Sequence, residues 1–125
     1  MKKQYSKAWL KSTQVRKQRK FRYTAPLHMR GRMLHVHLSP ELRKKYGLRN
    51  IQVRKGDTVK LMRGQFAPKQ GKVEKVLLKR QRIFVHGIDI IKKDGSKVLF
   101  PLPHTHLMIT ELELSDKRRL PQRTP

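Results

Sequence analysis

Positive charge is the feature that most constrains this chain. It carries 32 Lys and Arg against 8 Asp and Glu in 125 residues, which gives a formal net charge of +24. A compact domain with such an excess repels itself at low salt, so we expect it to work beside a polyanion. RNA or DNA is the commonest partner of this kind for a strongly basic domain.

The rest of the composition excludes several classes of protein. Hydrophobic residues make up 36% of the chain, which suffices for one small core. The absence of cysteine excludes disulfides, thiol catalysis and cysteine-based zinc sites. Apolar runs such as residues 83–85 are far shorter than the roughly 20 residues of a membrane span, and no secretory signal follows Lys2 and Lys3. We therefore expect a soluble, intracellular protein with no membrane partner.

The charge is concentrated in the first part of the chain. Residues 1–55 hold a net +16 of the total, with Glu41 as their one acid, and residues 16–22 are the densest run. Aromatic residues are interleaved with these cations without a clear period, so the segment cannot bury a core of its own. We expect an extended arm over residues 1–32 that orders against RNA, because bases stack on rings while cations meet phosphates. The alternative is a solubilising tail, although such tails are more often acidic or rich in Ser and Gly.

Capping residues predict one short helix near residues 39–46. Ser39 is a suitable N-cap, Pro40 suits the first helical position, and Gly47 suits the position after the last turn. The cations in its last turn either complement the helix dipole or contact phosphate. The preceding residues 26–38 are ambiguous between a helical turn and a strand.

From residue 53 onward the pattern alternates like a β-sheet. Asp94-Gly95 is a strong hairpin signal. The predicted strands are residues 58–61, 72–77, 82–86, 88–91, 98–100 and 107–110. Short strands in so small a unit favour a closed sheet, so we expect a mainly β fold with a small β-barrel. The predicted organisation is a basic extension over residues 1–52, the barrel over residues 53–114 and a surface tail over residues 115–125.

Two patterns that suggest catalysis or metal binding do not hold. Gly64 and Gly71 precede Lys72 as in a phosphate-binding loop, but six residues separate the glycines instead of four and Val73 follows the lysine. The pairs His35/His37 and His104/His106 have the spacing of metal ligands, yet nothing in the sequence brings the pairs together. We expect these histidines to hydrogen bond to RNA or to the backbone.

The acidic residues also give no sign of catalysis. They form no paired arrangement for acid–base chemistry, and Asp57 is expected to cap a turn. We therefore predict a protein that is not an enzyme, with no cofactor, no bound metal and no small-molecule substrate.

Residues 53–88 resemble a KOW motif, a strand–loop–strand unit of SH3-like barrels in ribosomal proteins and transcription elongation factors. Gly64 and Gly71 bracket an exposed loop whose backbone can approach RNA closely because it lacks a Cβ atom. Phe66, at the expected tip of the loop, has a ring that can stack or fill a groove. The resemblance rests on Lys55-Gly56-Asp57-x-Val59, Arg63-Gly64, Gly71-Lys72-Val73 and Lys79-Arg80.

Segments on both sides of this motif make the resemblance more specific. They are residues 16–20, 25–28, 38–47, 49–50 and 109–118. In this order they resemble ribosomal protein L twenty-four in its archaeal form, which is called L twenty-six in eukaryotes. The resemblance covers about residues 16–119.

This resemblance implies an SH3-like barrel and a structural role in the large ribosomal subunit of the cytoplasm. It also implies binding to the 5′ region of large-subunit rRNA, contact with neighbouring large-subunit proteins, an early role in subunit assembly and a position near the exit of the peptide tunnel. The alternative is a KOW-type transcription elongation or RNA-chaperone protein, although such factors usually carry a further polymerase-binding domain.

The predicted rRNA-binding residues come mainly from the basic run, from the KOW loop 64–71 and from the tract 79–82. They are Arg16, Lys17, Arg19, Lys20, Arg22, His28, Arg30, Arg32, Arg49, Arg54, Lys55, Arg63, Gly64, Phe66, Lys69, Lys79 and Arg80. No catalytic residue and no metal ligand is predicted.

Overall fold

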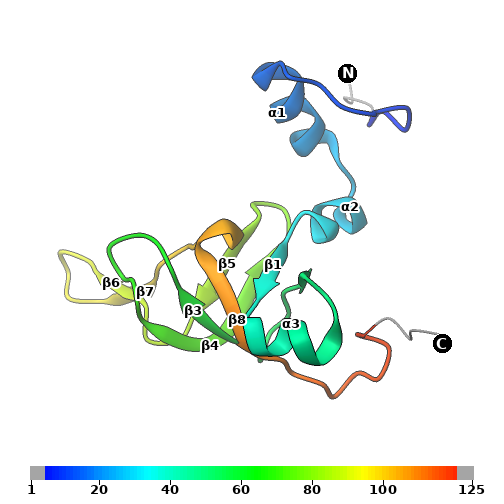
Figure 1. The fold of residues 1–125 in the computed structure, drawn as a ribbon. Helices are drawn as coiled ribbons and strands as arrows, with labels where there is room; N and C mark the ends of the chain where they lie inside the picture. Colours follow the sequence, from blue (N-terminus) through cyan, green and yellow to red (C-terminus); the bar gives the residue numbers. More distant parts are fainter. Residues whose placement is uncertain (1–4, 121–125) are drawn as a thin grey trace.

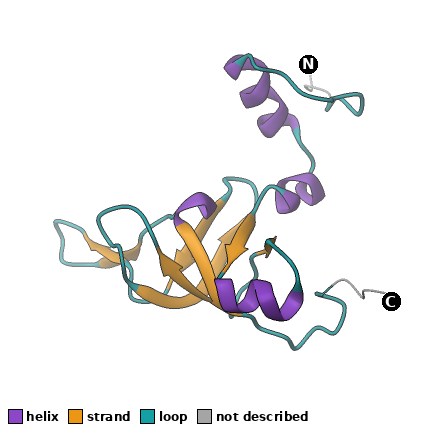
Figure 2. Cartoon of the chain, viewed as in Figure 1, coloured by secondary structure: helices purple, strands orange, loops and turns teal. Residues whose placement is uncertain are grey.

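A mixed six-stranded sheet with short helices at its margins forms the body of the protein (Figures 1 and 2). The computed structural model describes residues 5–120. In chain order the elements are α1 (Val15–Thr24), α2 (Leu27–Arg32), β1 (His35–Leu38), α3 (Pro40–Tyr46), β2 (Asn50–Gln52), β3 (Thr58–Leu61), β4 (Gln70–Leu77), β5 (Arg82–Val85), β6 (Asp89–Ile91), β7 (Lys97–Leu99), the 3-10 helix η1 (His104–His106) and β8 (Leu107–Glu111).

The strand order in the main sheet is β2-β1-β8-β3-β4-β5. All neighbouring pairs are antiparallel except β1 and β8, which run parallel with Leu38 opposite Ile109. Buried and outward residues alternate along β3 and β5, as they do on strands with one face against a core. The mainly β class predicted from the sequence is therefore confirmed.

The sheet does not close into the expected barrel. Strands β2 and β5 are its two edges. Up to residue 120, the chain after β5 pairs with that strand only through the bridge between Ile83 and Leu102, where each backbone nitrogen donates to the other residue's carbonyl oxygen at 2.9 and 2.8 Å. Pro101 and Pro103 flank Leu102 and have no N–H to donate. The pairing stops at this one residue, so the sheet stays open.

Two strands of the sheet come from the segment that was assigned to the extension. Strands β1 and β2 lie before residue 53, and Leu34, Val36, Leu38 and Ile51 belong to the buried hydrophobic cluster. The alternation at residues 35–38 therefore marks a strand, while the helical turn after Pro26 is also present as α2.

The helix and hairpin predicted from local signals are both present. Helix α3 has Ser39 as its N-cap, whose hydroxyl accepts from the Leu42 amide at 3.4 Å, and it ends at Gly47 with φ of 62°. Strands β6 and β7 pair antiparallel on either side of Asp94 and Gly95, and this hairpin projects away from the main sheet (Figure 1).

Residues 15–24 and 27–32 are helical, so the prediction of an extended arm is wrong there. Helix α1 buries none of its residues, and it extends beyond one side of the sheet with α2 between them (Figure 1). Trp9 and Tyr5 pack on Phe21 of this helix, and Arg30 donates to the Tyr23 carbonyl. These contacts come from residues just before and after α1, and a search for apolar periodicity does not detect them.

The segment after β8 is also more than the predicted surface tail. Arg119 is buried and forms an ion pair with buried Asp57, with two nitrogen–oxygen contacts of 2.5 Å. Asp57 also accepts from the amides of Arg54 at 2.8 Å and Glu113 at 3.0 Å. The turn-capping role predicted for Asp57 is confirmed, and the same carboxylate fixes the C-terminal segment to the sheet. Residues 121–125 of the predicted tail lie outside the described residues, as do residues 1–4 of the extension.

Candidate nucleic-acid interface

Cations gather where α1 and α2 meet the turn between β4 and β5. We call α1, α2, this turn and Arg82 the basic end. Its exposed basic residues are Arg16, Lys17, Arg19, Lys20, Arg22, Arg32, Lys79, Arg80 and Arg82. The sequence contains no acid in residues 1–40 or 75–88, so no carboxylate within these segments offsets the charge.

Helix α1 has the charge pattern of an anion-binding surface and not that of a self-stabilised helix. Its cations recur three and four residues apart, as in Arg16, Arg19 and Lys20, and such like-charged pairs destabilise a helix by about 0.2–0.5 kcal/mol each. Its first turn holds cations and no acid, opposite to what the helix dipole favours. In α3, by contrast, Glu41 lies in the first turn and the cations lie in the last. External phosphates would relieve the repulsion within α1.

Arg30 fastens the basic end to the sheet. Its Nε donates to the carbonyl of Ala25 at 2.8 Å, its Nη1 to the carbonyl of Lys79 at 2.9 Å, and its Nη2 to the carbonyl of Tyr23. One guanidinium thus connects the end of α1, α2 and the β4–β5 turn. Arg30 is one of the predicted rRNA-binding residues. In the structure its side chain binds backbone carbonyls and so holds the segments that carry other cations in place.

The pKa of His104 reflects the positive charge of this region. Partial burial lowers its pKa below the usual 6.5, and the positive charges of Arg22 and Arg82 and the nearby His35 lower it further. Residues from α1, β5, η1 and β1 therefore lie close together, although they span most of the chain. Of the predicted residues, Arg22 on α1 thus lies near η1 and β5, and Lys79 in the β4–β5 turn is joined to α2 through Arg30.

A groove beside the β3–β4 loop continues this surface. It has a volume of about 630 Å³, and Arg63, Phe66, Phe100, Arg82 and His106 are among the residues that line it. The rings of Phe66 and Phe100 are 5.2 Å apart, and the Lys69 ammonium lies 5.5 Å from the Phe66 centroid. Phe66 is half-buried, so it forms the floor of a groove and not a free loop tip.

The two glycines of this loop have different roles. Gly64 has φ of 97°, a conformation that favours glycine. A Cβ atom on Gly71 would lie 2.5 Å from the His86 carbonyl oxygen. Gly71 therefore allows a close approach of two chain segments within the sheet, and the expected approach of this loop to RNA stays a prediction.

The remaining predicted residues lie apart from this convergence. Arg54 and Lys55 are in the turn between β2 and β3, where the Arg54 guanidinium pairs with Asp116 at 2.7 Å. Arg49 precedes β2. Burial lowers the pKa of His37, and the positive charges of Arg43 and Arg49 lower it further. His28 is an exposed residue of α2.

Arg82 belongs to the predicted tract 79–82 but not to the list of predicted rRNA-binding residues. It links the two surfaces, since it lines the groove and also lies near His104. The signal for it was present, because Ile83 and Val85 alternate inward on β5 and place Arg82 outward.

The histidine pairs do not form a metal site. His104 and His106 lie on η1 and not on a strand, and His35 instead lies 3.0 Å from the side-chain oxygen of Asn50. Within residues 5–120, no group of three or more His, Cys, Asp or Glu side chains is placed to hold a metal ion. No helix in this range is long and apolar enough to cross a membrane.

Comparison with known proteins identifies the family. The family of the eukaryotic L26 and archaeal L24 ribosomal proteins matches residues 12–122. The large ribosomal subunit protein uL24 of Methanothrix thermoacetophila is 53% identical over 108 residues, which cover 86% of this chain and 93% of that protein. The protein of the same name from Methanospirillum hungatei is 52% identical over 108 residues, covering 86% and 90%. The chain belongs to this L26/L24 ribosomal protein family.

Membership of the L26/L24 family confirms the resemblance stated from the sequence and decides between the two interpretations. The ribosomal interpretation holds over the elongation-factor one, and the protein is a structural ribosomal component and not an enzyme. A role for the exposed cations of this L26/L24 protein therefore has to be sought outside catalysis.

Proposed function

We propose that this protein is a structural constituent of the large ribosomal subunit and binds large-subunit rRNA through the basic end and the groove beside Phe66. The observation that carries the proposal is the convergence of α1, α2 and the β4–β5 turn into one cationic surface with no acid in these segments. Relatives named as large ribosomal subunit proteins support the same partner.

The proposed mechanism is neutralisation of phosphates by preplaced cations. Lys and Arg side chains release condensed counterions from RNA on binding, and this release favours association at low salt. The exposed cations of the basic end contact phosphates together with Arg63 and Lys69. Arg30 acts as a positioning residue, because its guanidinium is bonded to three carbonyls, and Arg82 joins the contact set.

The finer parts of the proposal come from the family resemblance. They are the 5′ region of the rRNA as the binding site, an early role in subunit assembly, a position near the peptide tunnel exit and contacts with neighbouring large-subunit proteins. The assignment of residues 53–88 as a KOW unit of SH3-like type belongs to the same proposal.

Salt dependence tests the mechanism directly. If roughly ten phosphates are neutralised, the logarithm of the affinity for an rRNA fragment falls with the logarithm of salt concentration at a slope of about −7 to −9. A slope near −2 would contradict the mechanism. Sedimentation of a tagged form in native lysate tests the location: co-migration with large subunits at moderate salt supports it, and migration as free protein or with RNA polymerase overturns it.

A further inference from the structure

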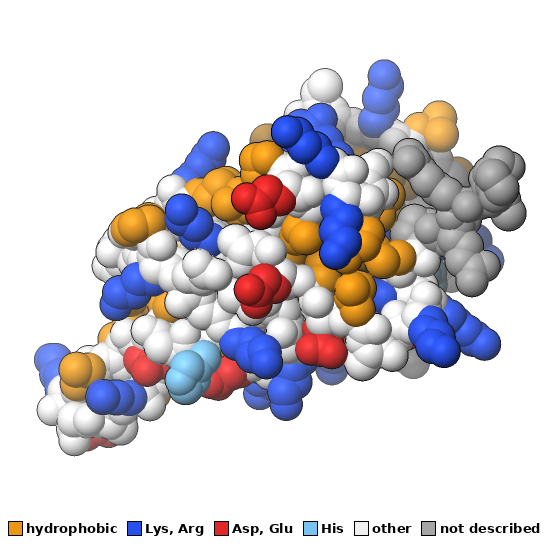
Figure 3. Space-filling model, turned by 60° about the horizontal axis from the view of Figure 1, so that its bottom comes forward, with side chains coloured by type: hydrophobic (Ala, Val, Ile, Leu, Met, Phe, Trp, Pro, Cys, Tyr) orange, Lys and Arg blue, Asp and Glu red, His pale blue; other side chains and the backbone are white. Residues whose placement is uncertain are grey.

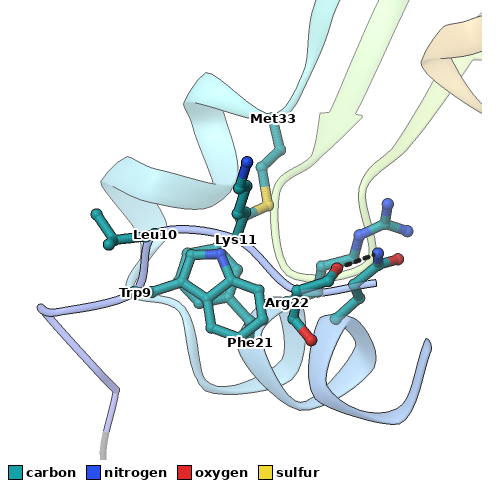
Figure 4. A pocket seen from close by; sticks show the side chains of 8 residues that line it. Trp9, Leu10, Lys11, Phe21, Arg22 and Met33 are labelled. Atoms are coloured by element: carbon teal, nitrogen blue, oxygen red, sulfur yellow. Dashed lines mark hydrogen bonds between the residues drawn. The ribbon is translucent and has the colours of Figure 1, made fainter. Parts of the chain in front are cut away.

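An aromatic cluster outside the hydrophobic core lies next to the basic end. The indole of Trp9 stacks on the ring of Phe21, with centroids 4.7 Å apart and planes inclined by 17° (Figure 4). The ring of Tyr5 also approaches that of Phe21, with centroids 5.4 Å apart. Both stacked residues are half-buried, and the cluster folds the N-terminal segment against α1. Two large rings thus remain partly exposed to solvent among cations.

A hollow opens beside the stacked pair. It has a volume of about 300 Å³, and Trp9, Lys11, Phe21, Arg22 and Met33 line it together with Leu10, Ser12 and Gln18 (Figure 4). This volume is at the small end of the range for ligand pockets, about 300–1,000 Å³, which suits a single planar ring. The charged residues in its lining are all basic.

The hollow is connected to the cationic surface. The sulfur of Met33 accepts from Nε2 of Gln81 in the β4–β5 turn at 2.9 Å, so the floor of the hollow contacts the segment that carries Lys79 and Arg80. Arg22 borders the hollow and also faces His104. An RNA strand that follows the cations of the basic end would pass the open side of this hollow.

Aromatic rings flanked by Lys and Arg are the pattern with which proteins bind single-stranded nucleic acid, because every base has a face that stacks and every linkage has a phosphate. Duplex RNA cannot use such a hollow, because its bases are already stacked on each other. A hollow of this kind therefore favours single-stranded RNA over duplex RNA.

We propose that the hollow at Trp9 and Phe21 is a stacking site for one unpaired nucleobase of the RNA, with the adjoining phosphates held by Lys11 and Arg22. This inference rests on the proposed function in that the ligand is RNA. It adds that the protein binds a single-stranded element, such as a loop or bulge, at the basic end. A purely structural stack, which only fastens the N-terminal segment to α1, is the competing explanation.

Trp9 is the only tryptophan of the chain, so its fluorescence reports on this site alone. The full chain is titrated with a short oligoadenylate, with an oligoadenylate–oligouridylate duplex of the same length and with inorganic polyphosphate. Stacking predicts that the single strand quenches Trp9 strongly and that the other two probes quench it weakly. Equal quenching by all three probes would overturn the proposal.

Variants provide a second measurement with labelled oligoadenylate. Trp9→Leu is expected to raise the Kd about five- to hundred-fold, and Trp9→Phe, which keeps a ring, is expected to recover most of the affinity. Tyr46→Leu is the matched control, since Tyr46 is an aromatic residue beside a lysine, 5.3 Å from Lys45 Nζ, on α3. Unchanged affinity in Trp9→Leu would contradict the proposal.

The outcomes separate this inference from the proposed function. If Trp9→Leu loses helix by circular dichroism, the quenching of the unmodified chain and the Trp9→Phe variant still decide the question. If RNA binds in a salt-dependent manner but neither quenches Trp9 nor responds to Trp9→Leu, only the stacking site is overturned. Failure of the chain to bind either single-stranded or duplex RNA overturns the proposed function itself.

Discussion

Arginine side chains in two regions of the molecule have opposite surroundings. At the C-terminal segment, the guanidinium of Arg119 is bonded to Asp57, and that of Arg54 is bonded to Asp116. At the basic end, no Lys or Arg side chain of α1, α2 or the β4–β5 turn is paired with a carboxylate among the described ion pairs. Arginine is thus paired with carboxylates in one region, whereas in the other it faces outward as unneutralised charge, except for Arg30, which is bonded to backbone carbonyls.

The distribution of acids explains this contrast. The face at the bottom of Figure 1 shows acidic side chains among the Lys and Arg (Figure 3), whereas the segments of the basic end contain none. An internal ion pair contributes to stability in the free protein, while an unpaired cation contributes only when an anion arrives. One region is therefore suited to hold the fold together, and the other is suited to bind.

Removal of the buried carboxylate of Asp57 should give the largest of the expected effects, a loss of folding stability. Asp57→Ala leaves the buried Arg119 guanidinium without its partner, and breaking such a pair typically costs about 3–5 kcal/mol of the free energy of unfolding. Chemical denaturation measures the loss. The affinity of the folded fraction for RNA is expected to stay nearly unchanged, because the hydrogen-bond partners of Asp57 all lie outside the basic end.

Asp116→Ala is the matched control for this experiment. Its pair with Arg54 is exposed, with 47% and 45% of the two side chains accessible, and exposed pairs contribute little to stability because solvent screens them. Similar destabilisation by both variants would show that burial is not what distinguishes the Asp57 pair, and the contrast between the two regions would lose its energetic basis.

Arg30→Lys tests whether an arginine of the basic end holds structure. Lysine keeps the charge but cannot donate to three separate carbonyls from a planar guanidinium, so we expect a loss of about 1–2 kcal/mol in the local stability of α2. Amide hydrogen exchange should then be roughly tenfold faster in α2. Arg32→Lys, on the same helix, is expected to change exchange little, and equal effects would contradict the positioning role.

The double variant Arg19→Ala with Lys20→Ala tests the opposite property. Loss of two phosphate contacts should weaken binding to an rRNA fragment several-fold and make the salt slope less steep by about two. The free energy of unfolding should hardly change. Lys44→Ala with Lys45→Ala removes the same charge from α3, where the cations suit the helix dipole, and is expected to affect RNA binding less. Equal loss of folding stability in the Arg19/Lys20 variant would show that α1 is structural.

The sequence predicted those features that depend on neighbours along the chain. Helix α3 carries its own caps in Ser39 and Gly47, and the β6–β7 hairpin carries its turn in Asp94 and Gly95. The strands follow from alternation, and the identity of the binding cations follows from composition. Each of these signals acts within a few residues.

The features that were missed depend on contacts across the chain. Arg30 reaches a carbonyl 49 residues away, and Arg119 reaches a carboxylate 62 residues away. Helix α1 has no side-chain cap and no buried face, so no local signal distinguished it from an extended arm. The order of strands in the sheet decides which of the predicted cations lie close together. It also places Arg82 between them.

The pH dependence of RNA affinity is the smallest expected effect, and it tests the positive charge of the basic end at a single residue, His104. The pKa of His104 lies below 6.5 because of its partial burial and of repulsion by Arg22, Arg82 and His35. In the free protein the lowered pKa of His104 makes the fold less stable as the pH falls below about 6.5, because the unfolded chain takes up the proton more readily. RNA phosphates beside Arg22 and Arg82 would offset the repulsion and raise the pKa of His104 in the complex. Binding then takes up a proton, so the affinity should rise about two- to threefold as the pH falls from about 7.5 to 5.5.

Two substitutions assign this pH dependence to its source. His104→Asn should abolish the increment, whereas His37→Asn should not, because the pKa of His37 is lowered by burial, Arg43 and Arg49, which lie outside the basic end. Nuclear magnetic resonance titration of the imidazole signals with and without RNA measures both residues in one sample. A pKa of His104 that is the same in the free and bound protein would mean that phosphate does not approach Arg22 and Arg82, and the proposed interface would then have to lie elsewhere on α1.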